Sequence, residues 1–111
     1  INTGGEKVFP EEVEEALKTH PAVRDAVAVG IPDDKFGEVV TAVVEVGADD
    51  EDGDGVDSAA LIAHVRSKLA AYKAPKQVFP IDTIGRAPNG KVDYERLRAY
   101  AADTAAAAAA G

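Results

Sequence analysis

Several residue types are absent or scarce in this sequence, and each absence removes a class of function. There is no cysteine among the 111 residues, which excludes disulfide bonds, thiolate nucleophiles and cysteine-ligated metal sites. Positive charge is also scarce, since 12 lysines and arginines stand against 20 aspartates and glutamates, a net charge of −8. This balance argues against nucleic acid or an anionic membrane as the main partner. No apolar run approaches the roughly 20 residues of a transmembrane helix.

Methionine is absent as well, and the chain begins Ile-Asn-Thr-Gly-Gly. We therefore expect this chain to be one part of a longer protein. Its length fits a single domain, and a hydrophobic content of 46% is enough for a core. The lack of cysteine fits a reducing compartment. We expect a cytoplasmic protein that meets a membrane only through parts outside this chain.

The first half of the chain predicts one helix and two strands. A proline and two glutamates open the helix within residues 8–21, and a second proline closes it. The β-branched runs at 23–31 and 38–46 predict two antiparallel strands, apolar because both faces of the sheet are covered. Residues 47–57 are acidic and rich in glycine. We interpret them as a solvated connection, because the glutamate that closes a calcium loop is missing.

The second half predicts another helix and a short strand. Residues 58–72 carry apolar side chains at helical spacing, which predicts an amphipathic helix capped by Ser58 or Asp57. A strand follows within residues 73–82. Two prolines bracket it, which favours a position at the edge of the sheet.

A last helix is expected to start at Asp93, and the alanine-rich residues 104–111 are predicted to be a disordered tail. Residues 1–103 would then form the folded domain. The predicted fold class is α+β, with a small mixed sheet of about three main strands and a short hairpin, packed with three helices.

The stretch IGRAPNGKVDYERLR, residues 84–98, contains the main candidate site. Asn89 and Gly90 form a turn dipeptide in which both residues accept positive φ at low cost. Asp93 is placed to cap the following helix. Lys91 is therefore a flexible cation between two stiff elements. On this evidence alone, a simply solvated lysine remains the more common interpretation.

The other candidate residues give weaker signals. His20 and His64 are far apart in the sequence, and for both we favour a solvated or hydrogen-bonded side chain over a ligand or base. Gly4-Gly5 is either a hairpin corner or a backbone segment that a substrate passes closely. The sequence has no GxxxxGK[ST] or GxGxxG phosphate loop, and we predict no metal site.

Four motifs in order resemble the C-terminal domain of the adenylate-forming enzymes, a superfamily of acyl-CoA synthetases, nonribosomal peptide synthetase adenylation domains and luciferases. The resemblance covers nearly all of residues 1–100 and favours fatty-acid–CoA ligases. The motifs are the glycine-glycine-glutamate loop with its helix (1–23), the strand-turn-strand unit (26–46), the tyrosine-lysine-x-proline segment (69–78) and the terminal glycine-lysine loop with its helix (85–98).

The resemblance implies a two-step reaction in a two-domain enzyme. A carboxylate attacks the α-phosphate of ATP, which arrives with Mg²⁺, to give acyl-AMP and pyrophosphate; the thiol of coenzyme A then displaces AMP. The N-terminal domain of the same polypeptide holds the ATP loops and the acyl pocket. The small domain rotates between the steps, and alone it is expected to be inactive.

The resemblance also implies roles for individual residues. Lys91 would reach into the site for adenylation, with Asn89, Gly90 and Asp93 supporting its loop. The backbone of Gly4, Gly5 and Glu6 would line the tunnel for the pantetheine arm of coenzyme A. Tyr72 and Lys73 are further candidates for contacts near coenzyme A.

This sequence departs from the family pattern at Gly85, where the terminal loop usually has a proline, and a looser loop is expected. Two alternatives to an acyl-CoA ligase stay open. One is the lid of an adenylation domain that loads a carrier protein, and the other is a binding module of the same fold without chemistry. The acyl chain is not encoded here, because its pocket belongs to the other domain.

Overall fold

The computed structural model describes residues 1–46 and 57–110. The interpretation of 47–57 as a solvated connection therefore lies, except for Asp57, outside the described residues. The elements in chain order are β1 (Asn2–Thr3), β2 (Glu6–Lys7), α1 (Pro10–Lys18), β3 (Val23–Asp33), β4 (Gly37–Val46), α2 (Ser58–Arg66), the 3₁₀-helix η1 (Ala71–Lys73), β5 (Gln77–Pro80) and α3 (Tyr94–Ala110).

The helices begin where the local signals place them. Pro10 opens α1, two glutamates lie in its first turn and a lysine lies in its last, which suits the helix dipole. Of the two predicted caps of α2, Asp57 makes the bond: its Oδ1 accepts from the backbone N–H of Ala60 at 3.0 Å. The helix ends at Arg66, earlier than predicted, and Tyr72 lies in the separate η1.

The sheet is mixed, as predicted. Strands β3 and β4 pair antiparallel from Val23 opposite Val46 to Asp33 opposite Gly37. Strand β5 runs parallel to β4 at the sheet edge, while the β1–β2 hairpin joins β4 where Thr3 faces Gly37. The three main strands and the short hairpin of the sequence prediction are thus confirmed.

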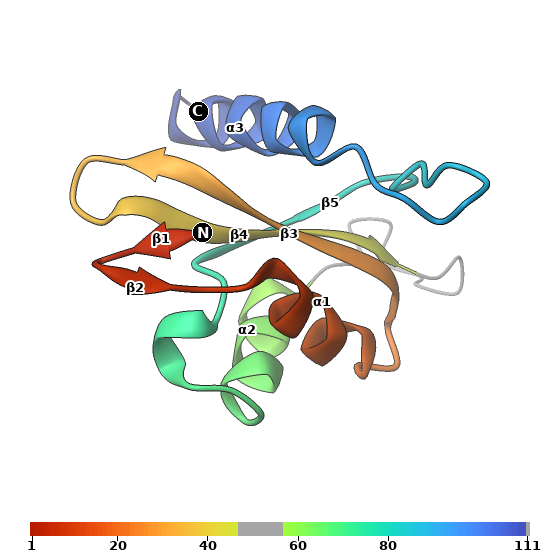
Figure 1. The fold of residues 1–111 in the computed structure, drawn as a ribbon, viewed down its shortest axis with the longest axis horizontal. Coiled ribbons are helices and arrows are strands. Elements are labelled where there is room, and N and C mark those ends of the chain that lie inside the picture. The colour runs from red at the N-terminus through yellow and green to blue at the C-terminus, as the bar shows by residue number, and fades with distance from the viewer. Residues whose placement is uncertain (47–56, 111) are drawn as a thin grey trace.

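Helices cover both faces of this sheet (Figure 1). The α1 and α2 helices pack on one face and α3 packs on the other, so alternate residues of β3 and β4 enter two separate cores. The first core includes Val13, Leu17, Ala26, Ala28, Val40, Val44, Leu61 and Val65, and the second includes Val27, Val29, Val39, Val43, Ile84, Leu97 and Ala101.

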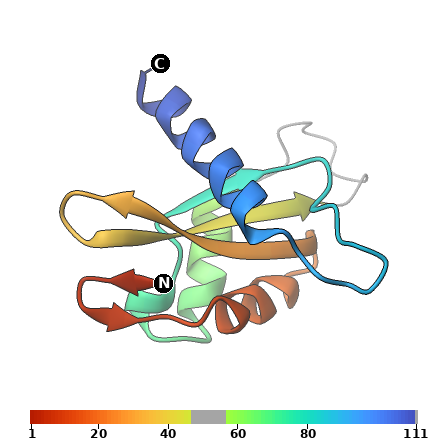
Figure 2. The same cartoon turned by 45° about the horizontal axis from the view of Figure 1, so that its top comes forward.

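The alanine-rich segment differs from its prediction. Helix α3 continues through residues 104–110, and in Figure 2 its C-terminal part extends beyond the sheet. Alanine has the highest helix propensity, and no glycine or proline interrupts the run before Gly111. The disordered tail predicted at 104–111 is therefore helical as far as Ala110. None of the helices in the described ranges is long and apolar enough to cross a bilayer.

Candidate functional site

The loop that carries Lys91 is closed by a tight turn of three residues, 88–90. The backbone N–H of Gly90 donates to the carbonyl of Ala87 at 2.7 Å, and the N–H of Ala87 donates to the carbonyl of Lys91 at 2.9 Å. Pro88 and Asn89 are then the central residues of a type I turn, followed by Gly90 at φ +84°. The expectation of positive φ at both Asn89 and Gly90 is wrong for Asn89, because Pro88 moves the turn one residue earlier.

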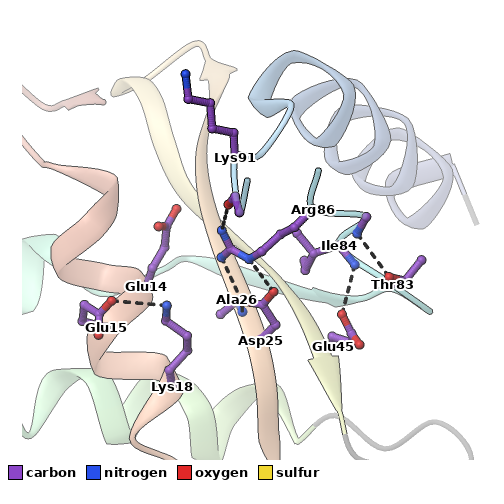
Figure 3. A network of polar contacts seen from close by, with 12 residues as sticks. Glu14, Glu15, Lys18, Asp25, Ala26, Glu45, Thr83, Ile84, Arg86 and Lys91 are labelled. Carbon is purple, nitrogen blue, oxygen red and sulfur yellow. Dashed lines mark hydrogen bonds and ion pairs between the residues drawn. The ribbon is translucent and has the colours of Figure 1, made fainter. Parts of the chain in front are cut away.

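The root of Lys91 is held by both of its backbone groups. Its N–H donates to Oδ1 of Asn89 at 3.0 Å, while its carbonyl accepts the bond from Ala87. The side chain is exposed, and Figure 3 shows it pointing away from the polar network beneath the loop. Asn89 and Gly90 thus lie where the sequence places them, in direct support of Lys91.

The helix start after Lys91 is equally well defined. Asp93 caps α3, since its Oδ1 accepts from the backbone N–H of Arg96 at 3.1 Å. Val92, before the cap, and the fully buried Leu97 pack into the same core, as a hydrophobic staple does. The helix cap predicted at Asp93 is therefore confirmed.

Arg86 ties this loop to the sheet, and the sequence alone did not indicate it. Its Nε and Nη2 donate to the two carboxylate oxygens of Asp25 on β3, at 2.7 and 2.9 Å (Figure 3). Its Nη1 donates to the carbonyl of Gly90 at 3.0 Å, directly before Lys91. The hydrogen bonds from Arg86 lower the pKa of Asp25, and the same pairing raises the pKa of Arg86.

A second polar contact holds the other side of the loop. Glu14 on α1 is only 6% exposed, and its Oε2 accepts from the backbone N–H of Ala28 on β3 at 3.0 Å. The Tyr94 hydroxyl donates to the same oxygen at 2.9 Å. Burial, and then the bond to Glu14, raise the pKa of Tyr94 to about 12. The first residue of α3 is thereby tied to both α1 and β3.

Gly85, where the family pattern has proline, has φ +73°, a conformation that proline cannot adopt. Its N–H donates to Oγ1 of Thr83 at 3.1 Å, and the N–H of Ile84 donates to Oε2 of Glu45 at 3.1 Å. The Arg96 guanidinium donates to the carbonyl of Ile84. These three contacts tether the chain at Ile84 and Gly85, and the expectation of a looser loop stays a prediction.

The glycine pair forms the tip of the β1–β2 hairpin. Gly4 and Gly5 have φ +58° and +86°, between the paired residues Thr3 and Glu6. Positive φ at both central positions is the geometry of a type I′ turn, which favours glycine. The N–H of Gly4 also donates to the carbonyl of Phe36 at 2.8 Å, so the hairpin leans on the β3–β4 turn. Gly5 and Glu6 are exposed.

The Tyr72-Lys73 segment lies in η1. Tyr72 is 43% exposed. The Lys73 ammonium is bound by the Glu12 carboxylate at 2.9 and 3.1 Å, and this bond raises the pKa of Lys73. Two further lysines, Lys35 and Lys76, lie over the ring of Phe36 at 5.4 and 5.1 Å. Cations therefore gather beside the glycine hairpin.

The two histidines, distant in the sequence, are neighbours in space. Their ring centroids lie 5.0 Å apart in an edge-to-face contact between His20, just after α1, and His64 on α2. The Nδ1 of His20 accepts from the backbone N–H of Ala22 at 3.1 Å, and Nε2 of His64 lies 2.7 Å from Oγ1 of Thr19. Burial and then the charge of His20 lower the pKa of His64. The hydrogen-bonded interpretation holds for both.

The predicted site residues fall into two groups. Lys91, Asn89, Gly90 and Asp93 share the loop between β5 and α3, while the hairpin and η1 residues lie elsewhere on the surface. Figures 1 and 2 place the hairpin and that loop toward opposite ends of the sheet. Within the described residues, no three histidine, aspartate or glutamate side chains are grouped as a metal site requires.

Residues 12–91 match the family described as the AMP-binding enzyme C-terminal domain. This chain belongs to that family. The resemblance inferred from the four motifs is thereby confirmed, and so is the fold.

Relatives of this AMP-binding enzyme C-terminal domain include CoA ligases. The chain is 55% identical over 94 residues to 3-oxocholest-4-en-26-oate–CoA ligase of Rhodococcus rhodochrous, covering 85% of this chain and 16% of that enzyme. It is 48% identical over 101 residues to the medium-chain acyl-CoA ligase Mig of Mycobacterium avium, covering 91% and 18%.

Among solved structures, the Mycobacterium tuberculosis fatty acyl CoA synthetase matches this domain with a TM-score of 0.81 at 33% identity, over 94% of this chain and 20% of that one. The domain therefore spans no more than 20% of the length of these three proteins.

Proposed function

We propose that this domain serves an ATP-dependent acyl-CoA ligase, which activates a carboxylic acid, such as a fatty acid, as acyl-AMP and then forms the thioester with coenzyme A. The family match and the relatives named as CoA ligases support this proposal. The partner is the N-terminal domain of the same polypeptide, which supplies the ATP loops and the acyl pocket. ATP as its magnesium complex and coenzyme A are substrates, and we expect the reaction to be cytoplasmic.

The observation that carries the proposal is the fixed root and exposed side chain of Lys91. In adenylation, a carboxylate oxygen bonds to the α-phosphorus of ATP and the bond to pyrophosphate breaks. Both reactants are anionic, so a cation held between them lowers the barrier and favours the in-line approach. Lysine suits this role because its ammonium is a compact charge with three donors.

The glycine hairpin is assigned to the second step. Gly4 and Gly5 present bare backbone at an exposed turn, which lets a narrow thiol-bearing chain pass closely. The cations Lys35 and Lys76 beside the hairpin suit the phosphates of coenzyme A. Tyr72, four residues before Lys76, offers an exposed ring, whereas the Lys73 charge is already paired with Glu12.

Lys91→Ala in the full-length ligase tests the proposal. We expect adenylation, measured as pyrophosphate exchange, to fall about 10²–10³-fold, the usual cost of removing one preorganised electrostatic donor. Thioester formation from supplied acyl-adenylate should remain, because the rotated domain would carry Lys91 away from the site before the thiol attacks. Lys91→Arg should restore little, since a planar guanidinium differs in shape and donor geometry.

Two controls make the result decisive. Lys68→Ala removes another exposed lysine, after α2 and outside the loop, and should leave both half-reactions unchanged. A melting curve should show that Lys91→Ala folds normally, since the Asn89 and Asp93 contacts remain. Unchanged pyrophosphate exchange in the folded Lys91→Ala variant would overturn the assignment.

A further inference from the structure

We propose that Arg86 and Tyr94 are positioning residues for adenylation. Through the contacts Arg86–Asp25 and Tyr94–Glu14, together called the clamp, they hold the backbone of Lys91 from both sides. The inference rests on the proposed function and extends it to two residues of the terminal loop segment to which the sequence analysis assigns no role. Arg86 precedes Lys91 by five positions and Tyr94 follows it by three.

The first side of the clamp anchors the turn. A bidentate pair fixes the plane of the Arg86 guanidinium on Asp25, with both bonds at 2.9 Å or less. The remaining Nη1 reaches the carbonyl of Gly90, which belongs to the peptide bond that leads into Lys91. Any shift of Arg86 therefore moves the backbone at the base of the Lys91 side chain.

Asp25 lies at an irregularity in the pairing of β3 with β4. The register of β3 against β4 shifts between Val23 and Asp25, and such an irregularity redirects a side chain out of the ladder. The side chains of Arg86 and Asp25 are 33% and 18% exposed, so the pair is partly shielded from solvent. It connects the loop to the longest strand of the sheet rather than to another loop.

The second side anchors the start of α3. The Glu14 carboxylate is buried, and one of its oxygens accepts from both the Ala28 N–H and the Tyr94 hydroxyl. A buried carboxylate needs such donors, because an unpaired one is costly. Tyr94 therefore fixes the direction in which the chain leaves Lys91 and enters the helix.

Neither contact touches the Lys91 ammonium, so these residues act through its backbone. The lysine side chain has four rotatable carbon links, and its reach is set by where the root stands. Misplacing a catalytic group by about 1 Å costs on the order of 10²-fold in rate. We expect a loop held on one side only to allow displacements of that size.

The experiment uses the full-length ligase with Arg86→Gln and Tyr94→Phe. Each variant should lower pyrophosphate exchange about 10- to 100-fold and change thioester formation from supplied acyl-adenylate by less than about twofold. Arg86→Lys should rescue exchange in part, because it keeps the charge but loses the bidentate pairing. Arg66→Gln makes the same substitution on α2, and it should leave both half-reactions unchanged.

Combining each variant with Lys91→Ala separates positioning from an independent role. If the clamp acts only through Lys91, Arg86→Gln and Tyr94→Phe should cause no further loss of exchange in the Lys91→Ala background. A further loss equal to that seen alone, or an equal fall in both half-reactions, would overturn the clamp.

The outcomes also separate this inference from the proposed function. Loss of exchange in Lys91→Ala, with normal exchange in folded Arg86→Gln and Tyr94→Phe, would overturn the clamp and leave the proposed function standing. Normal exchange in Lys91→Ala would overturn the proposed function and the clamp with it.

Discussion

Gly85→Ala is the sharpest test of how the Lys91 loop is built. A Cβ on Gly85 would lie 2.8 Å from Nη2 of Arg96. This nitrogen donates a hydrogen bond to the carbonyl of Ile84. The backbone is also in the left-handed region, at φ +73°. The substitution therefore acts twice, through backbone strain and through a displaced guanidinium.

The two effects can be sized separately. Placing a non-glycine residue in the left-handed region costs about 1–2 kcal/mol. The Arg96 side chain is flexible and can withdraw, but it then leaves the carbonyl of Ile84, a residue that is 1% exposed. A buried acceptor without its partner costs about 1–3 kcal/mol. We expect Gly85→Ala to destabilise the domain by about 2–5 kcal/mol in total.

Gly90→Ala provides the matched control, because Gly90 has φ +84° and nothing within 4 Å of the added Cβ. It should cost only the backbone share, about 1–2 kcal/mol. The assay is urea unfolding of the 111-residue chain followed by far-UV circular dichroism, since the sequence has no tryptophan. Gly85→Pro, which restores the usual family residue, should destabilise at least as much as Gly85→Ala, since proline fixes φ near −65°.

The double substitution with Arg96→Ala decides the mechanism. Without the guanidinium, the excess cost of Gly85→Ala over Gly90→Ala should disappear. Equal stability of the Gly85→Ala and Gly90→Ala variants, or an excess that persists without Arg96, would refute the reasoning.

Two further predictions concern the clamp and the hairpin. Tyr94 should ionise near pH 12, so alkaline spectrophotometric titration should show an ionisation there that Tyr94→Phe removes. Because its folded pKa is raised, its contribution to stability is complete below about pH 10 and is lost as pH rises through about 12. The prediction would be contradicted if the free energy of unfolding fell no more steeply with pH in this window for the native chain than for Tyr94→Phe. Gly5→Val in the full-length ligase should largely spare pyrophosphate exchange and slow thioester formation. An equal loss in both half-reactions, with a lowered melting temperature, would instead indicate misfolding at the strained φ of +86°.

Local signals predicted most of the fold. Proline and acidic residues placed the start of α1, and β-branched runs placed β3 and β4 within two residues of their observed bounds. Asp93 was identified as a cap because a cap is a contact between near neighbours. The alanine tail shows the limit of compositional reasoning, since a low-complexity run is also a good helix former when a packed helix precedes it.

The contacts that hold the Lys91 loop could not be predicted, because the residues that make them are distant in the sequence. Arg86 and Asp25 are 61 positions apart, and Tyr94 and Glu14 are 80 apart. Glu14 follows the core residue Val13, and a glutamate is expected to face solvent. It is buried here because β3 is an edge strand whose Ala28 N–H needs an acceptor.

The arrangement of the two loops has a mechanical consequence for the proposed function. The hairpin and the Lys91 loop are both fixed to the same two-core sheet, the first through β4 and the Phe36 carbonyl and the second through Asp25. Because each loop is tied to packed strands, we expect it to move with the sheet rather than to bend alone toward a bound acyl group. If both loops serve one active site, the domain has to turn as a rigid body between adenylation and thioester formation. A stiff Lys91 loop is then an advantage, because the ammonium returns to the same position in every cycle.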